Sequence, residues 1–160
     1  MKRLISIVVL LWVLVSCEDQ VKFNNPALQG LKDNVVWRAT LITAEQSADG
    51  SLKIMAYQKN EILILTTIAA NVQTYPLGEN LSNRAVLTQN GTDDTAIFST
   101  GIDSGDGEIV ITELDAVNHT VTGEFNFTAN NESQDPITGS SVSFRKGIFY
   151  KVPLTNTVKK

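Results

Sequence analysis

The stretch TVTGEFNFTA at residues 120–129 decides the fold class, because its side chains alternate between two chemical types. Successive side chains of an extended strand point to opposite faces, so this alternation gives the strand one apolar face and one polar face. One set is Val121, Gly123, Phe125, Phe127 and Ala129, and the other set is Thr120, Thr122, Glu124, Asn126 and Thr128. A half-buried strand of this kind is typical of antiparallel sheets, so we expect one that covers a hydrophobic core.

Segments that are typical of β-strands extend over most of the chain. Short segments rich in Val, Ile, Thr, Phe and Tyr alternate with turns of Gly, Asn and Asp, which is the signature of an all-β domain. We expect strands at residues 35–46, 51–58, 61–69, 84–89, 95–100, 108–114, 120–129 and 142–152. The segment that begins at Glu61, EILILTTIAA, is apolar on both faces and is expected at the centre of a sheet. An antiparallel meander of about eight strands has to cover both its faces or close, so we predict a β-sandwich or a flattened β-barrel.

The long connections of this meander are the first candidates for a binding surface, because long loops on a rigid scaffold commonly carry function. If the strands run simply up and down, the loops at 47–50, 70–83, 101–107 and 130–141 share one end of the domain. The first strand then begins at the opposite end, so the long loops face away from the N-terminus. A separate short strand in TYPLG, residues 74–78, would reverse the order of the ends after it.

The N-terminus has the layout of an export signal. Lys2 and Arg3 precede the run LISIVVLLWVLV at residues 4–15, which is too short for a membrane-spanning helix of about 20 residues. The end of this run, LVSC at 14–17, resembles the lipobox of bacterial lipoproteins. The resemblance implies cleavage before Cys17 and attachment of lipid to it, and two or more acyl chains hold a protein stably on a membrane. The alternative is an ordinary secretory signal followed by a free thiol.

These features divide the chain into four parts. Residues 1–16 are expected to be a removed signal peptide, 17–34 the lipidated cysteine and a flexible tether, 35–155 a single all-β domain, and 156–160 a C-terminal tail. Phe23 and Leu28 are the candidate contacts of the tether with the domain. Cys17 is the only cysteine, so the domain has no internal disulfide and depends on its core.

Four motifs, in order, resemble one family. They are FNNPALQGLKDNVVWRA at 23–39, TYPLG at 74–78, GEIVITELDAVNHTVTGEFNFTA at 107–129 and GIFYKVP at 147–153. Together they resemble the DUF6252 group of small Bacteroidota lipoproteins, a domain of unknown function, over most of residues 23–153. One departure is ANVQTYPLG, which lacks a glycine just before Tyr75. The resemblance implies a location and a fold, and it carries no catalytic residues.

The same resemblance bears on Glu18 and Asp19, which directly follow Cys17. Acids in this position resemble a Bacteroidota signal for export to the outer face of the outer membrane. The alternative is that they only keep the tether solvated. We expect a protein anchored to the outer membrane by the lipid on Cys17 and facing the cell surface, with the periplasmic face as the alternative.

Composition argues against several classes of function. The chain has 13 basic and 17 acidic side chains, and loss of Lys2 and Arg3 with the signal leaves 11 and 17, a net charge near −6. Binding to nucleic acid, which needs a basic patch, is therefore not expected. His119 is the only histidine and lies in an expected turn, so a zinc or copper site is not expected. The common catalytic and phosphate-binding motifs do not occur, so we expect a protein that is not an enzyme and has no cofactor.

Two weak candidate sites remain. Asp103, Asp106 and Glu108 offer carboxylates that suit calcium, although glycines stand where an EF-hand loop would carry further acids. The alternative is a glycine-rich turn before the next strand. Thr95, in the triplet DTA, resembles an acceptor for O-glycans in Bacteroidota.

Three hypotheses on function follow from the sequence. The first is a non-catalytic binding module that holds a glycan, a peptide or a partner protein through the distal long loops. The second is a structural or accessory subunit of an envelope complex, which an apolar patch on a sheet face would favour. The third is a closed barrel that carries a small molecule, which a ligand-sized interior would favour. An enzyme is disfavoured by the missing motifs, and a buried carboxylate pair with a perturbed pKa in a cleft would revive that hypothesis. The sequence sets no oligomeric state.

Overall fold

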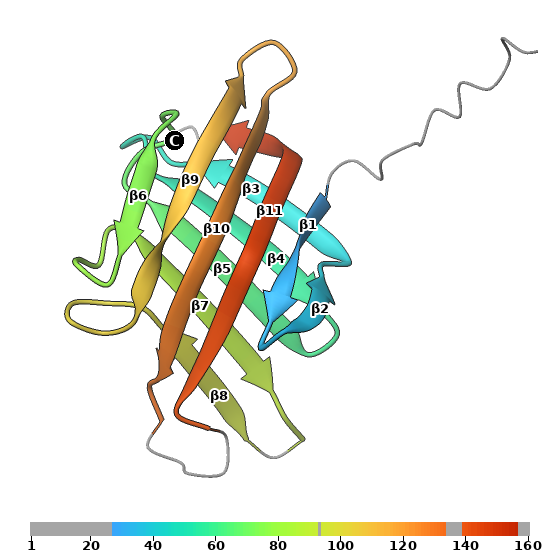
Figure 1. Ribbon diagram of the computed structural model, residues 1–160. Coiled ribbons are helices and arrows are strands. Elements are labelled where there is room, and N and C mark those ends of the chain that lie inside the picture. The colour runs from blue at the N-terminus through green and yellow to red at the C-terminus, as the bar shows by residue number, and fades with distance from the viewer. Residues whose placement is uncertain (1–26, 93, 134–138, 157–160) are drawn as a thin grey trace, which may run out of the picture.

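The structure, a computed structural model, describes residues 27–92, 94–133 and 139–156 (Figure 1). Its strands are β1 (Ala27–Lys32), β2 (Val35–Arg38), β3 (Leu41–Gln46), β4 (Leu52–Gln58), β5 (Glu61–Thr67), β6 (Thr74–Leu77), β7 (Arg84–Asn90), β8 (Thr95–Ser99), β9 (Asp106–Asp115), β10 (Thr120–Asn131) and β11 (Ser141–Asn156). These ranges contain no helix long and apolar enough to cross a membrane. The expected all-β class is confirmed.

The eleven strands form one sheet that folds into two layers. We call the order β2-β1-β11-β10-β9-β6 the front sheet and the order β3-β4-β5-β7-β8 the back sheet. At one corner, residues 154–156 of β11 pair in parallel with residues 44–46 of β3. At the other corner, Asn130 and Asn131 of β10 pair with β8. Figure 1 shows the back strands crossing behind the front ones, so the molecule is a β-sandwich closed into a flattened barrel.

The core lies between the two sheets. The five apolar or small residues of the stretch 120–129 are all buried, which confirms the alternation expected from the sequence. The ring centroids of Phe127 and Phe144 lie 5.0 Å apart, and Trp37 meets Phe144 edge-on at 5.6 Å. The strand β5 lies between β4 and β7, at the centre of the back sheet as expected. In the described ranges one cluster of buried apolar side chains forms this core.

Two β-bulges allow β11 to pair with strands of both sheets. Lys146 and Lys151 have positive φ angles of 50° and 47°, and beside each of them β11 has one residue more than the facing part of β10. A bulge bends its strand and increases its twist. The bends turn the end of β11 away from the front sheet and toward β3, which closes the barrel.

All eight expected segments form strands, but the structure adds to them. The expected strand 35–46 is bent at its middle into β2 and β3, which lie in different sheets. The strand β1 occupies part of the expected tether, so the sheet begins at Ala27 and not at Val35. Leu28 is 0% exposed, which confirms the contact expected of it. The motif TYPLG forms the separate strand β6 at the edge of the front sheet.

The expectation that the strands run simply up and down is wrong, because the chain crosses between the two sheets from β2 to β3, and β6 of the front sheet comes between β5 and β7 of the back sheet in the sequence. Asp33, in the β1–β2 turn, exchanges two hydrogen bonds of 2.9 Å with Ser143. The turn beside Val35 therefore lies at the same end of the front sheet as the long β10–β11 connection. Ala27 pairs instead with Tyr150, toward the β9–β10 turn. The described chain thus still enters the fold at the end opposite that connection (Figure 1).

Candidate functional site

The predicted lipidation and sorting residues, Cys17, Glu18 and Asp19, lie outside the described residues, and so does Phe23. Their roles stay predictions. Thr95 is the first residue of β8, is exposed, and its hydroxyl donates to Asn90 Oδ1 at 3.4 Å. An exposed hydroxyl at a strand end is accessible, and its glycosylation also stays a prediction.

The structure does not gather the three predicted calcium ligands into one site. Asp103 lies in the β8–β9 loop, Asp106 begins β9 and is exposed, and Glu108 accepts a hydrogen bond of 3.2 Å from Asn126 Nδ2. The described part of the chain contains no group of three or more His, Cys, Asp or Glu side chains that could hold a metal ion. The glycine-rich turn fits better, because Gly105 has a φ of 70° and a Cβ there would lie 2.4 Å from a backbone oxygen.

His119 is a turn residue, as expected. It has a φ of 51° and its carbonyl accepts a hydrogen bond of 2.8 Å from the Leu154 N–H. Asp115 holds the same turn by accepting hydrogen bonds of 2.9 Å from the N–H groups of Val117 and Asn118. Hydrogen bonds from the Asn118 side chain and backbone keep the pKa of Asp115 below its ordinary value of 3.8. These contacts shape a tight β-turn and explain the residues without a catalytic role.

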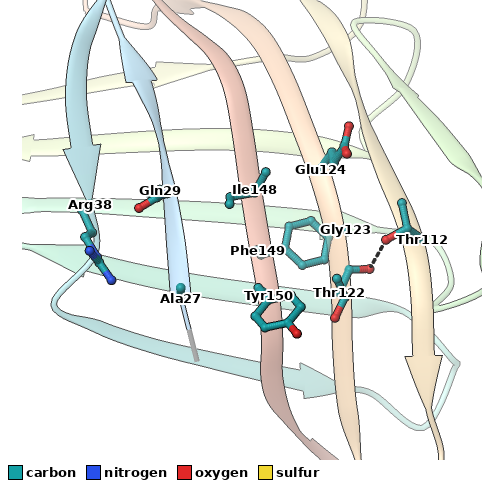
Figure 2. Close-up of a pocket in the computed structure, with 10 residues that line it drawn as sticks. All are labelled: Ala27, Gln29, Arg38, Thr112, Thr122, Gly123, Glu124, Ile148, Phe149 and Tyr150. Carbon is teal, nitrogen blue, oxygen red and sulfur yellow. Dashed lines mark hydrogen bonds between the residues drawn. The ribbon is translucent and has the colours of Figure 1, made fainter. Parts of the chain in front are cut away.

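A groove of about 510 Å³ crosses the outer face of the front sheet (Figure 2). Residues from β1, β2, β9, β10 and β11 line it: Ala27, Gln29, Arg38, Thr112, Thr122, Gly123, Glu124, Ile148, Phe149 and Tyr150. Its volume lies in the range of small-molecule sites, and apolar atoms form more of its wall than polar atoms do. We call it the front groove.

One row of side chains runs straight across the front groove. Arg38 on β2 faces Gln29 on β1, Gln29 faces Ile148 on β11, and Ile148 faces Glu124 on β10. At a strand spacing of about 4.8 Å, the backbones of Arg38 and Glu124 lie roughly 14 Å apart. The row therefore places a cation at one end, a carboxylate at the other, and an amide and an aliphatic side chain between them.

A second row of the groove has mostly small side chains and includes the aromatic residue Tyr150. Ala27 faces Tyr150, and the Thr112 hydroxyl donates to the Thr122 carbonyl at 3.3 Å. The Lys151 ammonium lies 5.4 Å from the centroid of the Tyr150 ring. Because Ala27 and the two threonines are small, the half-buried Tyr150 ring is the dominant wall on this side (Figure 2).

Backbone irregularities shape this part of the sheet. A bulge at Thr112 in β9 and the one at Lys151 in β11 flank Gly123 from both sides. Gly123 itself lets β10 approach the Phe149 ring, because a Cβ there would lie 2.3 Å from that ring. The buried Phe149 ring thus fixes the floor, while the bulges bend the strands around it.

Sequence reasoning placed the binding surface in the long loops and missed the front groove. The signal that could have found it is Gly123, a glycine inside an alternating strand pattern. Such a glycine often marks a bulge or a close backbone approach. The alternation around Gly123 reports burial and does not by itself report a close backbone approach.

The outer face of the back sheet carries an apolar row. Tyr57 pairs with Leu41 on one side and with Ile62 on the other, and Ile97 lies two strands beyond Ile62 in the same row. Leu41 is 58% exposed and the other three are partly exposed. Thr88 of β7 stands between Ile62 and Ile97, so Leu41, Tyr57 and Ile62 are the adjacent apolar residues of this row. Adjacent apolar residues on a sheet face are what the structural-subunit hypothesis requires.

A carboxylate joins the two sheets beside the β1–β2 hairpin. Glu61 of β5 accepts hydrogen bonds from Lys32 Nζ, from Trp37 Nε1 at 2.5 Å and from Gln89 Nε2 at 2.6 Å. Burial raises the pKa of Glu61, but these hydrogen bonds outweigh burial and hold the pKa below its ordinary value of 4.5. All the contacts of this carboxylate are internal, so we assign it a structural role.

Comparison with known proteins gives one match. A family model described as a domain of unknown function (DUF6252) matches residues 24–153, which include β1 to β10 and most of β11. No curated protein and no solved structure matches the chain.

Proposed function

The chain belongs to the DUF6252 family, a domain of unknown function, and we propose that it is a non-catalytic binding module whose ligand lies in the front groove. The observation that carries the proposal is the row from Arg38 to Glu124. Neither of these residues takes part in the ion pairs of the described chain, which join Lys32 to Glu61 and Arg84 to Glu132. Both charges are exposed at the ends of a groove and are available to a ligand.

The lining of the front groove suits one or two units of a glycan. A sugar ring has an apolar C–H face and a rim of hydroxyl groups. Tyr150 and Ile148 offer it an apolar surface, and an aromatic ring gives large contact area with little loss of conformational freedom. Arg38 and Gln29 donate hydrogen bonds to hydroxyl oxygens, and Glu124 accepts them from hydroxyl groups.

Lipid anchoring is the second part of the proposal. It is supported by the short apolar run, the LVSC motif and the lone cysteine. Ala27, which lines the groove, is the tenth residue after Cys17, so a lipid on Cys17 holds the groove within about 35 Å of the membrane. The ligand would then lie nearer to the membrane than the β10–β11 connection does, on the cell surface if Glu18 and Asp19 act as the export signal.

Glycan binding is tested with the purified chain on a glycan array, followed by calorimetry with the glycans it retains. Tyr150→Ala is expected to weaken binding at least about tenfold, because it removes the main wall of the groove. Tyr57→Ala, on the outer face of the back sheet, is the matched control and should bind as the wild type does. An array that retains no glycan, or equal affinities for the wild type and Tyr150→Ala, would contradict the proposal.

Anchoring is tested in a Bacteroidota host with Cys17→Ser. We expect the wild-type protein to carry acyl chains in its intact mass and to sediment with membranes, and the variant to lose both properties. Protease treatment of intact cells then compares the wild type with a Glu18→Ala/Asp19→Ala double variant. Equal protection of both proteins would favour the periplasmic face.

A second candidate function is a structural or accessory subunit of an envelope complex. The apolar row on the back sheet favours it, because an exposed row of this kind marks many protein interfaces. Ile62→Lys should then remove the protein from a larger envelope complex while leaving glycan binding unchanged. Blue-native electrophoresis of solubilised membranes measures the first effect, and migration of the wild type as a single chain excludes this function.

A further inference from the structure

The front sheet ends in two short strands, β2 and β6, each of which pairs with one neighbour in the described chain. In the back sheet β3 pairs with β11 over residues 44–46 and β8 pairs with β10 over residues 98 and 99, so both outer strands are covered over part of their length. An edge strand presents unpaired N–H and C=O groups to which another strand can add. The two edges of this protein differ in how they are protected.

Pro76 protects the β6 edge. The Ile111 N–H donates to the Gln73 carbonyl, and antiparallel pairs alternate between bonded and non-bonded positions. Tyr75 therefore bonds to β9, while Thr74 and Pro76 turn their main-chain groups outward. Proline has no N–H, so this edge lacks one of its two outward donors.

The β2 edge has no such protection. The Ala39 N–H donates to the Leu28 carbonyl at 3.0 Å, and by the same alternation Trp37 bonds to β1. The N–H and C=O groups of Val36 and Arg38 therefore face away from β1. No described strand lies on that side, and Val36 is 72% exposed. An incoming strand would find two donors and two acceptors here.

A second groove, of about 360 Å³, adjoins this edge. Val35 and Val36 line it from β2, and Lys59 and Asn60 line it from the β4–β5 turn. Val35 is 69% exposed, so two neighbouring valines present apolar surface beside the free main-chain groups. Strand addition draws affinity from main-chain hydrogen bonds and specificity from such side-chain contacts, and this edge offers both.

The free charges at the β2 edge are positive. Arg38 and Lys59 are exposed and join neither of the described ion pairs. Of the nearby acids, the Glu61 carboxylate is bound by Lys32, and the Asp33 carboxylate accepts a hydrogen bond from the Ser143 N–H. The chain as a whole has a net charge of −4, so this edge is a local exception. Two copies paired along β2 would bring like charges together, whereas an acidic partner would neutralise them.

We propose that β2 binds an extended, acidic segment of a partner protein, which adds to the front sheet as a further strand. This proposal is independent of the ligand in the front groove, because Val36 does not line that groove. The two proposals share Arg38, so the test relies on Val36 instead.

The test selects binders to the wild-type chain from a display library of random ten-residue peptides. We expect the enriched peptides to be acidic and to alternate apolar with polar residues. Val36→Pro removes an outward N–H group but no hydrogen bond to β1. It should weaken the binding of these peptides at least about tenfold. Val36→Thr keeps the N–H and should bind nearly as well as the wild type.

A second measurement does not depend on the fold of a variant. N-methylation of the enriched peptide at alternate residues should abolish binding to the wild type when it blocks one edge of the peptide, and should have little effect when it blocks the other. Failure to enrich acidic strand-forming peptides, or equal binding by Val36→Pro, overturns the proposal. A concentration-dependent dimer in sedimentation that Val36→Pro abolishes would assign the edge to a second copy instead.

Discussion

Trp37 donates its indole N–H to the Glu61 carboxylate at 2.5 Å, and this bond ties β2 in the front sheet to β5 in the back sheet. Lys32 and Gln89 donate to the same carboxylate, whose side chain is 14% exposed. The β1–β2 hairpin is thus held to the rest of the fold by a carboxylate with three donors. Such a satisfied network is stabilising as a whole, and removal of its acceptor leaves several donors unpaired.

Glu61→Gln tests this network. The amide keeps the shape of the side chain but loses the charge and replaces one acceptor oxygen with a donor, so at least one partner is left without an acceptor. We expect the free energy of unfolding to fall by roughly 1–3 kcal/mol in urea titrations followed by tryptophan fluorescence. Glu113→Gln, on an exposed position of β9, is the control and should change it by less than about 0.5 kcal/mol. Equal losses in both variants would contradict the role of Glu61.

The same network predicts a dependence on pH. The folded-state pKa of Glu61 lies below its ordinary value of 4.5, so its contribution is fully present above that value and is lost as the pH falls through the folded-state pKa. The stability difference between the wild type and Glu61→Gln should therefore be constant near neutral pH and shrink below 4.5. Urea titrations at stepped pH measure this difference in stability. Asp115 also has a lowered pKa, but it is present in both proteins, so its contribution does not change the difference. A difference that grows on acidification would disprove the assignment.

The sequence predicted the class of the fold because alternation along a strand reports burial directly. The burial pattern of the stretch 120–129 followed from that rule, and the central position of β5 followed from apolar residues on both of its faces. The strand β1 was missed because ALQGLK is short and has little β-branched character, so local propensity did not mark it. Tertiary pairing with β11 supplies what its own sequence lacks, since Leu28 is completely buried there.

The alternation of side chains does not by itself locate the front groove. Its rows join residues that are far apart in the sequence, such as Gln29 and Ile148, and their register depends on the bulges in β11. Strand patterns alone do not locate a bulge, because one extra residue shifts every side chain after it to the other face. Lys146 and Lys151 adopt a positive φ that lysine rarely takes, so their residue type does not predict a bulge at these positions.

Gly123→Ala tests the floor of the front groove. A Cβ at this position would lie 2.2 Å from the Val110 carbonyl oxygen and 2.3 Å from the Phe149 ring, and neither can move without shifting a strand. We expect a loss of about 3 kcal/mol or more in the free energy of unfolding. In Gly101→Ala the new atom would meet only Leu81 Cδ2, at an ordinary 3.5 Å, so this control should lose less than about 1 kcal/mol. Similar stabilities of the two variants in thermal unfolding would refute the close approach.

Lys146→Gly tests the bulge that bends β11. Lysine at a φ of 50° stores strain of roughly 1–2 kcal/mol, which glycine relieves, while glycine also costs about 0.5–1 kcal/mol in chain entropy. The two effects nearly cancel, so Lys146→Gly should leave the free energy of unfolding almost unchanged. Lys53→Gly, at an exposed position in the regular strand β4, gains no such relief and should lose about 1 kcal/mol. Lys146→Val should lose more than either, because a β-branched residue tolerates a positive φ poorly. The reverse order in urea titrations would mean that the bulge is not at Lys146.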